Sequence, residues 1–571
     1  MANITGTIGD DSITPGGVSP GVTGGVPDIV NDFINGLAGN DTLSGGGGRD
    51  QLLGGDGNDR LEVGTGDAVG DFLSGGNDDD LLLGATLPLL PGWSPNSLEG
   101  GAGNDTLNGF GSLANRADYS PRTLAVVVDL GAGTATLGTE VDTLIGIRAV
   151  RGTTQGDSVA GTGADEIVLP GGGNDLVDLG GGIDTVSYQP ATAAVAVDLL
   201  AGTGGGTSEG QDTLVGVENV TGGNFNDTLR GDAGVNEFRP LSGFDLVDGR
   251  EGEDWVSYVT WWNGTNNVTS TPGTGNSDPD TGVPFAGVEV NLALQFAIDQ
   301  WGFRDTLVSV EHAAGSPRGD ILTGALRPEA APSYLRGFAG NDLLRAERPG
   351  SGATADYAED PAGVRVNLSD GDAVLGGVRL AGGTARDGWG DTDVLVNINA
   401  VRGSAFRDHI IGSADADRLE GGAGNDTLAG GRPGEVDGGN LLLGGAGKDL
   451  LIATGLGDTL DGGQGRDTLR IETALGTMTT IRKFQAGTDR IEFHAAEFDL
   501  APGTDLGATG RFAANAGGSA TSAAGIGQFV YDTDDRLLLW DADGAGAGAA
   551  QLVVLFQGGG APGAADIQLI G

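Results

Sequence analysis

The stretch GLAGNDTLS-GGGGRDQLL-GGDGNDRLE, residues Gly36 to Glu62, consists of three consecutive nine-residue units. Each unit begins with Gly and has Gly at position four, Asp at position six and Leu at position eight. The residues around each Leu can form a short strand, but such a strand cannot bury its apolar side chain alone. The units are therefore expected to stack on one another. A Leu at every ninth residue argues against a disordered Gly/Asp-rich linker.

The residues between the predicted strands are mostly Gly, Asn and Asp. These residues tolerate positive φ, so they can turn the chain tightly and expose backbone carbonyl oxygens. Stacking places Asp41, Asp50 and Asp59 at one position of the turns, where their carboxylates would repel one another. A hard cation that takes roughly six to eight oxygen ligands removes this conflict. The pattern therefore predicts a hard cation bound between stacked turns.

The units closely resemble the RTX calcium-binding repeat of secreted Gram-negative bacterial proteins, G-G-x-G-x-D-x-U-x. The resemblance implies that the Asp at position six gives carboxylate oxygen and that turn residues give carbonyl oxygen. The predicted carboxylate ligands are Asp41, Asp50, Asp59, Asp105, Asp175, Asp184, Asp227, Asp254, Asp342, Asp417, Asp426, Asp449, Asp458 and Asp467. The predicted carbonyl donors lie at positions one and three of two units, namely Gly45, Gly47, Gly54 and Asp56. The alternative is that some of the aspartates only accept hydrogen bonds from turn amides.

The composition fits a chain that folds when calcium neutralises it. The 571 residues include 111 Gly, 79 acidic and only 30 basic residues, with a net charge of −49. Such a charge opposes a compact state by self-repulsion unless counter-ions bind. No basic patch is present, which argues against a nucleic-acid partner. The chain has no Cys, so disulfides and thiolate metal sites are excluded and oxygen ligands remain.

The sequence also bears on export. The N-terminal residues MANITGTIGDD lack the basic and apolar regions of a cleavable signal peptide. No run of 18 apolar residues occurs, which argues against membrane insertion. Acidic, Cys-free chains of this kind resemble substrates of bacterial type I secretion. The resemblance implies a secreted protein that is exported through an uncleaved C-terminal signal.

A second, longer repeat occurs four times, and we call its copies long modules one to four. Their first halves begin at Ala117, Val186, Val256 and Ala355, and their second halves begin at Asp142, Asp212, Asp305 and Asp393. A further nine-residue unit follows each copy. The V-x-V-[DN]-L and T-L-x-x-[IV] segments alternate as strands do. We expect the long modules to form wider coils of the same solenoid.

These observations predict an all-β fold, a calcium-binding parallel β-roll/β-helix solenoid with a C-terminal capping β domain. The predicted domains are an N-terminal roll at 1–115, the four long modules at 116–411, a second roll at 412–470, and a capping and secretion-signal domain at 471–571. The last domain resembles the C-terminal region of type I secreted RTX proteins, and a solenoid end has to be covered.

The sequence favours a non-enzymatic function. No H-E-x-x-H motif occurs, and the one G-x-S-x-G match, Gly17 to Gly21, lies in a Pro/Gly loop rather than a strand-turn-helix context. We expect a structural role at the cell surface or in the extracellular matrix, of surface-layer, fibre or adhesin type, with self-assembly of the chain. The alternative is a carbohydrate-binding or polysaccharide-active protein. In that case Trp261 and Trp262 would stack on the sugars of surface glycans, whereas otherwise they pack locally.

Overall fold

The computed structural model describes residues 2–64, 70–86, 95–259, 287–328, 331–432, 438–473 and 477–571. The chain forms two compact units, Met1–Asn276 with Gln295–His312, and Ser277–Leu294 with Ala313–Gly571. Strands dominate both units, and the helices of the described part are the short 3₁₀ turns η1 (Ala495–Phe498) and η2 (Ala564–Asp566). No helix within these ranges is long and apolar enough to cross a bilayer. Trp261 and Trp262 lie outside the described residues.

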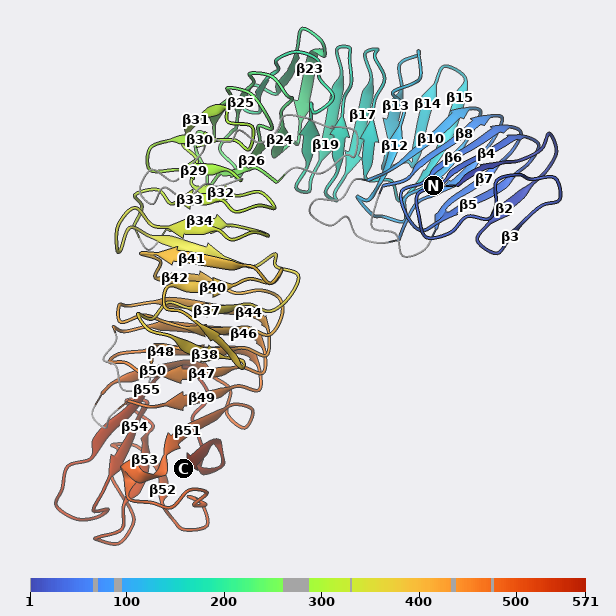
Figure 1. Ribbon diagram of the computed structural model, residues 1–571. Coiled ribbons are helices and arrows are strands. Elements are labelled where there is room, and N and C mark those ends of the chain that lie inside the picture. The colour runs from blue at the N-terminus through green and yellow to red at the C-terminus, as the bar shows by residue number, and fades with distance from the viewer. Residues whose placement is uncertain are drawn as a thin grey trace. The chain divides into compact units, whose positions relative to one another are not determined.

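In the first unit the chain alternates between two stacks of parallel strands, which we call stack A and stack B (Figure 1). Stack A contains β1 (Asn3–Thr5), β4 (Phe33–Ala38), β6 (Gln51–Asp56), β8 (Phe72–Asn77), β10 (Asn96–Ala102), β12 (Asn115–Asp118), β16 (Ala149–Arg151), β18 (Ile167–Leu169), β20 (Thr185–Ser187), β24 (Asn219–Thr221), β26 (Glu237–Arg239) and β28 (Trp255–Ser257). Outside the long modules, the parallel strands of stack B are β2 (Ser12–Thr14), β5 (Thr42–Gly46), β7 (Arg60–Gly64), β9 (Leu81–Leu83), β11 (Thr106–Asn108), β17 (Ser158–Thr162), β19 (Leu176–Gly180), β25 (Thr228–Arg230) and β27 (Leu246–Asp248).

One coil of the solenoid consists of two nine-residue units. Leu43 of β5 pairs with Leu61 of β7 in stack B, and Ile34 of β4 pairs with Leu52 of β6 in stack A. These four side chains are fully buried. A single apolar residue per strand thus fills the space between the two stacks, and the repeat at position eight predicted these inward positions correctly.

Each long module adds antiparallel strands to stack B. In module one, β13 (Val127–Asp129), β14 (Thr134–Leu137) and β15 (Glu140–Ile145) form an antiparallel meander. Its outer strands pair in parallel with the coils on either side, β15 with β11 and β13 with β17. In module two, β21 (Ala196–Asp198), β22 (Thr203–Gly206) and β23 (Gly210–Val215) repeat this order. The sequence predicted wider coils but did not predict the returning strand.

The second unit has the same two stacks (Figure 1). Stack A contains β34 (Ser333–Arg336), β36 (Ala353–Asp356), β42 (Ala400–Arg402), β44 (Arg418–Gly424), β46 (Leu441–Gly447), β48 (Thr459–Gly465), β50 (Thr479–Phe484) and β55 (Gln551–Gly559). Stack B contains β33 (Ile321–Thr323), β35 (Leu343–Arg345), β43 (His409–Ile411), β45 (Thr427–Ala429), β47 (Leu450–Ala453), β49 (Thr468–Ile471), β51 (Arg490–His494) and β56 (Ile567–Ile570). Module four contributes the meander β37 (Arg365–Asn367), β40 (Thr384–Arg386) and β41 (Thr392–Val396).

A C-terminal β domain caps the second unit. The strands β53 (Gln528–Asp532), β54 (Leu537–Asp541) and β55 are antiparallel, and β52 (Phe512–Asn515) pairs with β53. Phe493, Phe498, Phe529 and Trp540 form a buried aromatic cluster, with Phe498 and Phe529 ring centroids 4.7 Å apart. Aromatic side chains bury the most apolar area per residue, so a short β domain can close the open end of the coils. The predicted all-β solenoid with a C-terminal cap is confirmed.

Candidate calcium ladder

Buried aspartates form a hydrogen-bonded ladder along the turns. The backbone N–H of Asp41 donates to Oδ1 of Asp59 at 2.7 Å, and the N–H of Asp59 donates to Oδ1 of Asp80 at 2.8 Å. The N–H of Asp80 donates in turn to Oδ1 of Asp105 at 2.9 Å. A second ladder begins at Asp32, whose N–H donates to Oδ1 of Asp50 at 2.6 Å. Each coil therefore fixes one carboxylate oxygen of the coil that follows it.

The other carboxylate oxygen is buried without a hydrogen-bond partner at most positions of the ladder. Among the described residues, this holds for Oδ2 of Asp41, Asp59, Asp80, Asp105, Asp175, Asp184, Asp245, Asp254, Asp342, Asp426, Asp449 and Asp467. A buried carboxylate oxygen that has lost its water and gained no donor costs several kcal/mol, on the order of the penalty for an unpaired buried ion. A positively charged partner would therefore stabilise these oxygens.

The first glycine of each unit makes room for the free oxygen. A Cβ atom on Gly54 would lie 2.2 Å from Oδ2 of Asp59 and 2.4 Å from the carbonyl oxygen of Gly75. A Cβ atom on Gly36 would likewise lie 2.2 Å from Oδ2 of Asp41. The glycine thus leaves a space that carboxylate and carbonyl oxygens border together, and any other residue at this position would fill that space.

Electrostatics confirm that the ladder is costly without a cation. Burial, and then the carboxylates of Asp105 and Asp59, raise the pKa of Asp80 to about 8, although the Asp59 amide opposes the shift. Burial and the Asp212 carboxylate likewise raise the pKa of Asp175 to about 8, against the Asp157 amide. Burial raises the pKa of Asp426 to about 7, with Asp408 and Asp449 adding to the effect. A proton or a metal ion has to neutralise these groups near neutral pH.

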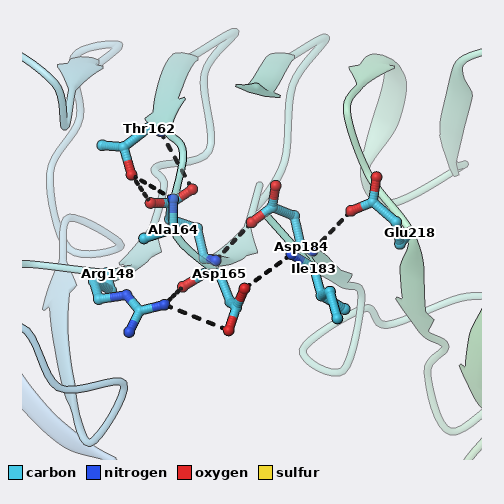
Figure 2. A network of polar contacts seen from close by, with 8 residues as sticks. Arg148, Thr162, Ala164, Asp165, Ile183, Asp184 and Glu218 are labelled. Atoms are coloured by element: carbon cyan, nitrogen blue, oxygen red, sulfur yellow. Dashed lines mark hydrogen bonds and ion pairs between the residues drawn. The ribbon is translucent and has the colours of Figure 1, made fainter. Parts of the chain in front are cut away.

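Glutamate extends the ladder between module one and the second half of module two, where the nine-residue pattern is irregular (Figure 2). The N–H of Glu166 donates to Oδ1 of Asp184 at 2.6 Å, and the N–H of Asp184 donates to Oε2 of Glu218 at 2.8 Å. Beside this ladder, the N–H of Ile183 donates to Oδ1 of Asp165 at 3.0 Å. Figure 2 shows the carboxylates of Asp184 and Glu218 in successive coils, each directed at a backbone amide of the coil before it. The longer glutamate side chain can occupy the aspartate position.

The second-half aspartates of the long modules have both oxygens satisfied. In each module a buried Tyr hydroxyl from the first half donates to Oδ2, and a backbone N–H donates to Oδ1. The Tyr–Asp pairs are Tyr119–Asp142 at 3.0 Å, Tyr188–Asp212 at 2.7 Å, Tyr258–Asp305 at 2.6 Å and Tyr357–Asp393 at 3.0 Å. The hydroxyl takes the place of the partner that the free oxygens lack.

The aspartate that follows each long module is satisfied by backbone amides. Oδ1 of Asp408 accepts from the N–H of Val364 at 2.7 Å, and Oδ2 accepts from the N–H of Ser404 at 2.7 Å. The Ser404 hydroxyl also donates to Oδ1 at 2.8 Å. The equivalent residues are Asp157, Asp227 and Asp320. These turns follow the alternative reading in which aspartate accepts hydrogen bonds from the turn.

The predicted ligands therefore fall into two groups. Asp41, Asp50, Asp59, Asp105, Asp175, Asp184, Asp254, Asp342, Asp426, Asp449 and Asp467 lie on the ladder with the carboxyl group buried. In contrast, Oδ2 of Asp227, Asp417 and Asp458 accepts turn N–H groups, from Gly223, Ser413 and Thr454. The assignment of both groups as calcium ligands stays a prediction. At Asn236, which replaces the aspartate, Nδ2 donates to the Glu218 carbonyl at 2.9 Å.

The nine-residue pattern did not predict several residues of the ladder. The unit of Asp32 has Pro27 and Val30 at the two glycine positions, and the unit of Asp71 has Val69 at position four. Asp80 ends a run of three aspartates in which Asp78 takes the glycine position with φ of 73°. The long-module aspartates were read only as strand residues. A search for Asp one residue before each T-L or S-L strand start would have found part of this set.

The residues present fit calcium. Among the described residues, no three His, Asp or Glu side chains converge to complete a site by themselves, so backbone carbonyls have to contribute ligands. The glycine-lined turns offer such carbonyls beside the free Oδ2 atoms. A bound calcium ion would supply the positive charge that the stacked carboxylates lack, and hard oxygen donors are its preferred ligands.

Comparison with known families agrees with this geometry. A model of the RTX calcium-binding nonapeptide repeat matches residues 29–61, 92–112, 212–247, 401–432 and 436–469. The chain contains RTX calcium-binding nonapeptide repeats in multiple copies. RTX repeats imply calcium binding, and the buried aspartate ladder is consistent with several sites. Proteins with RTX repeats are typically secreted. A search of curated proteins found no match to this chain.

Proposed function

We propose that this RTX protein is a non-enzymatic structural element outside the cell, in a surface layer, extracellular matrix or adhesive fibre, and that calcium makes it rigid. The observation that carries the proposal is the row of buried, unpartnered Oδ2 atoms along both units. Each is unfavourable in the folded chain without a cation and favourable with one. Folding and calcium binding are then a single equilibrium.

This coupling suits a protein that works outside the cell. Extracellular calcium modules have dissociation constants on the order of 10⁻⁴–10⁻³ M, so such sites stay empty in the cytosol and fill after export. The net charge of −49 keeps the calcium-free chain expanded and exportable. After export the filled ladder ties successive coils together and gives a stiff rod-like element within each unit.

The test is a calcium titration of the pure protein, followed by circular dichroism and electron microscopy. The proposal expects β structure to appear with calcium and ordered assemblies to form only in its presence. Full β structure in chelator would contradict the coupling of folding to calcium. Monomeric protein at every calcium concentration would contradict the assembling structural role.

A second candidate, glycan binding, rests on a pocket in module four. The pocket has a volume of about 580 Å³, and its lining includes Leu368, Ser369, Asn397, Asn399 and Asp415. Hydroxyl, amide and carboxylate groups beside apolar side chains suit a saccharide. Glycan-array binding that Asp415→Asn abolishes would favour this candidate, and turnover of a glycan would contradict the non-enzymatic proposal.

A further inference from the structure

Long modules three and four share a motif that modules one and two lack. The sequence D-x-W-G-x-x-D occurs at Asp299–Asp305 in module three, and D-G-W-G-D-T-D occurs at Asp387–Asp393 in module four. In both, the first Asp ends the returning strand of the meander and the last Asp is the Tyr-capped aspartate. The turn between them holds a Trp, Trp301 or Trp389.

The first aspartate of the motif is a buried carboxylate with one free oxygen. In module three, between β30 (Phe296–Ile298) and β31 (Arg304–Val308), Oδ1 of Asp299 accepts from the amides of Trp301 and Phe303 at 2.9 and 2.8 Å. Its side chain is 0% exposed, and Oδ2 has no partner among the described residues. The turn thus holds Asp299 in place by one oxygen and leaves the other unused.

A second free oxygen comes from the neighbouring RTX unit. Asp245 is buried, its Oδ2 has no partner, and its N–H donates to Oδ1 of Asp305 at 3.1 Å. The Gly243 amide of the same RTX turn favours the charged form of Asp299, which places the Asp299 carboxylate against this turn. Burial raises the pKa of Asp245 to about 8, and Asp305, Asp227 and Asp299 add to the effect.

Module four repeats the arrangement independently. Oδ1 of Asp387 accepts from the amides of Gly390 and Asp391 at 2.7 and 2.6 Å, and Oδ2 is buried without a partner. The neighbouring RTX aspartate, Asp342, also has a buried Oδ2 without a partner. The N–H of Gly340 donates to Oδ2 of Asp391 at 3.1 Å, so the two turns are joined directly.

An aromatic pair joins the two turns at each of the two places. Phe244 and Phe303 meet edge to face with ring centroids 5.2 Å apart in module three. Phe338 and Trp389 do the same at 6.0 Å in module four. Each pair joins the RTX turn to the D-x-W-G turn.

The other modules show what this position contains without the motif. The strand pairing places Ala135 opposite Asp142 in module one, just as Ala297 lies opposite Asp305 in module three. Two residues further along the returning strand, module one has the buried Leu137 where module three has Asp299. Module two has Gly206 there. An apolar residue is thus compatible with the coil, and the buried carboxylate is specific to modules three and four.

We propose that the D-x-W-G turns form two further divalent-cation sites, in which Asp299 with Asp245, and Asp387 with Asp342, bind one calcium ion each. These sites differ from the RTX sites because one carboxylate comes from a long-module meander and not from a nine-residue unit. Backbone carbonyls complete the shell, as they must where only two carboxylates meet. The inference rests on the proposed calcium binding of the chain.

Terbium provides the test, because it binds oxygen sites of this kind and the Trp of the turn can sensitise its emission. The full-length chain is titrated with terbium under Trp excitation, and bound calcium is counted by equilibrium dialysis. Asp299→Asn and Asp387→Asn each remove one bound ion and dim the sensitised emission. Trp301→Phe dims the emission but leaves the ion count unchanged. Asn keeps the Oδ1 atom that accepts the turn amides, so the turn is preserved.

Glu251→Gln is the control, because it removes one negative charge from an exposed position of an RTX turn. It leaves both ion count and emission unchanged. An ion count that stays the same in the Asp299→Asn and Asp387→Asn double variant overturns the inference, and shows that a proton occupies these sites. If the unaltered chain binds no calcium at all, the proposed function fails as well, so the two failures are distinguishable.

Stability gives a second readout. The Asp299→Asn variant is expected to be more stable than the unaltered chain in chelator, because a repelling carboxylate is gone, and less stable in calcium, because a ligand is gone. If Asp299 only accepts hydrogen bonds from the turn amides, the variant is expected to lose stability in both buffers. That result would contradict the proposed site.

Discussion

The RTX units and the long modules place aspartate at the same point of the coil but satisfy it differently. In the run from Arg418 to Ile471, Oδ1 accepts from a backbone amide and Oδ2 of Asp426, Asp449 and Asp467 is left free. In the long modules a Tyr hydroxyl occupies Oδ2, as Tyr188 does for Asp212.

The difference separates two ways of building one solenoid. Coils with free oxygens depend on a cation, whereas coils with Tyr-capped aspartates carry their partner within the chain. Alternation of the two would give segments that form only in calcium next to segments that hold their structure without it. The following experiments test that division, starting with the largest expected effect.

The pH dependence of stability should change sign with calcium. Burial raises the pKa of Asp80, Asp175 and Asp245 in the folded chain to about 8, far above the value of roughly 3.9 for an unfolded Asp. In chelator, the stability that protonation provides is complete below pH ~4 and is lost as the pH rises towards 8. With calcium bound, protons compete with the ion, so stability falls as the pH falls.

The measurement is the urea midpoint between pH 5 and 8, in chelator and in calcium. Parallel pH profiles in the two buffers would contradict the assignment of the ladder as the calcium site.

Filling the space beside the first glycine of an RTX unit should strongly destabilise a coil that binds calcium. A Cβ on Gly54 would meet Oδ2 of Asp59 at 2.2 Å and a backbone carbonyl at 2.4 Å. We expect Gly54→Ala to lower the free energy of unfolding in calcium by about 3 kcal/mol, the upper range for overpacking. Gly181→Ala is the matched control, because a Cβ there meets nothing within 4 Å. Equal effects of the two variants would contradict the role given to the first glycine.

Removing the Tyr hydroxyl should destabilise a long module, because a buried carboxylate oxygen loses its hydrogen-bond donor. Tyr188→Phe leaves Oδ2 of the buried Asp212 without its donor, which costs about 1–3 kcal/mol. The loss is expected to be the same in calcium and in chelator. A double-mutant cycle with Asp212→Asn measures the interaction energy between Tyr188 and Asp212. A coupling energy near zero would show that the Tyr188 hydroxyl does not stabilise the Asp212 carboxylate.

The smallest expected effect is a change in the free energy of unfolding in chelator that has opposite signs for Asn substitutions at two aspartates of neighbouring coils. At Asp426, the space beside Oδ2 also borders the Gly444 carbonyl, so the Asn amide can donate there. At Asp408, Oδ2 accepts the Ser404 amide, and an NH₂ group would oppose it. We expect Asp426→Asn to gain, and Asp408→Asn to lose, about 1 kcal/mol in chelator. Denaturant unfolding of both variants tests this, and the same sign for both would contradict it.

Local repetition explains what the sequence predicted. Leu43, Leu52 and Leu61 recur at nine residues, so strand spacing, inward side chains and most of the regular ladder followed from residues near one another. The Tyr–Asp pairs did not, because their partners are 23 to 47 residues apart in sequence. The returning strand β14 was not predicted either, since Thr134–Leu137 is only four residues long and pairs with β13 on one side and β15 on the other.

Hydrogen exchange with mass spectrometry tests the central claim most directly, by comparing the intact chain in calcium and in chelator. The account predicts that peptides covering β44 to β49 lose their protection in chelator, while peptides covering the Tyr-capped meander β21 to β23 keep most of theirs. Uniform loss across both regions, or full protection of β44 to β49 in chelator, would contradict the division between calcium-dependent and Tyr-capped coils.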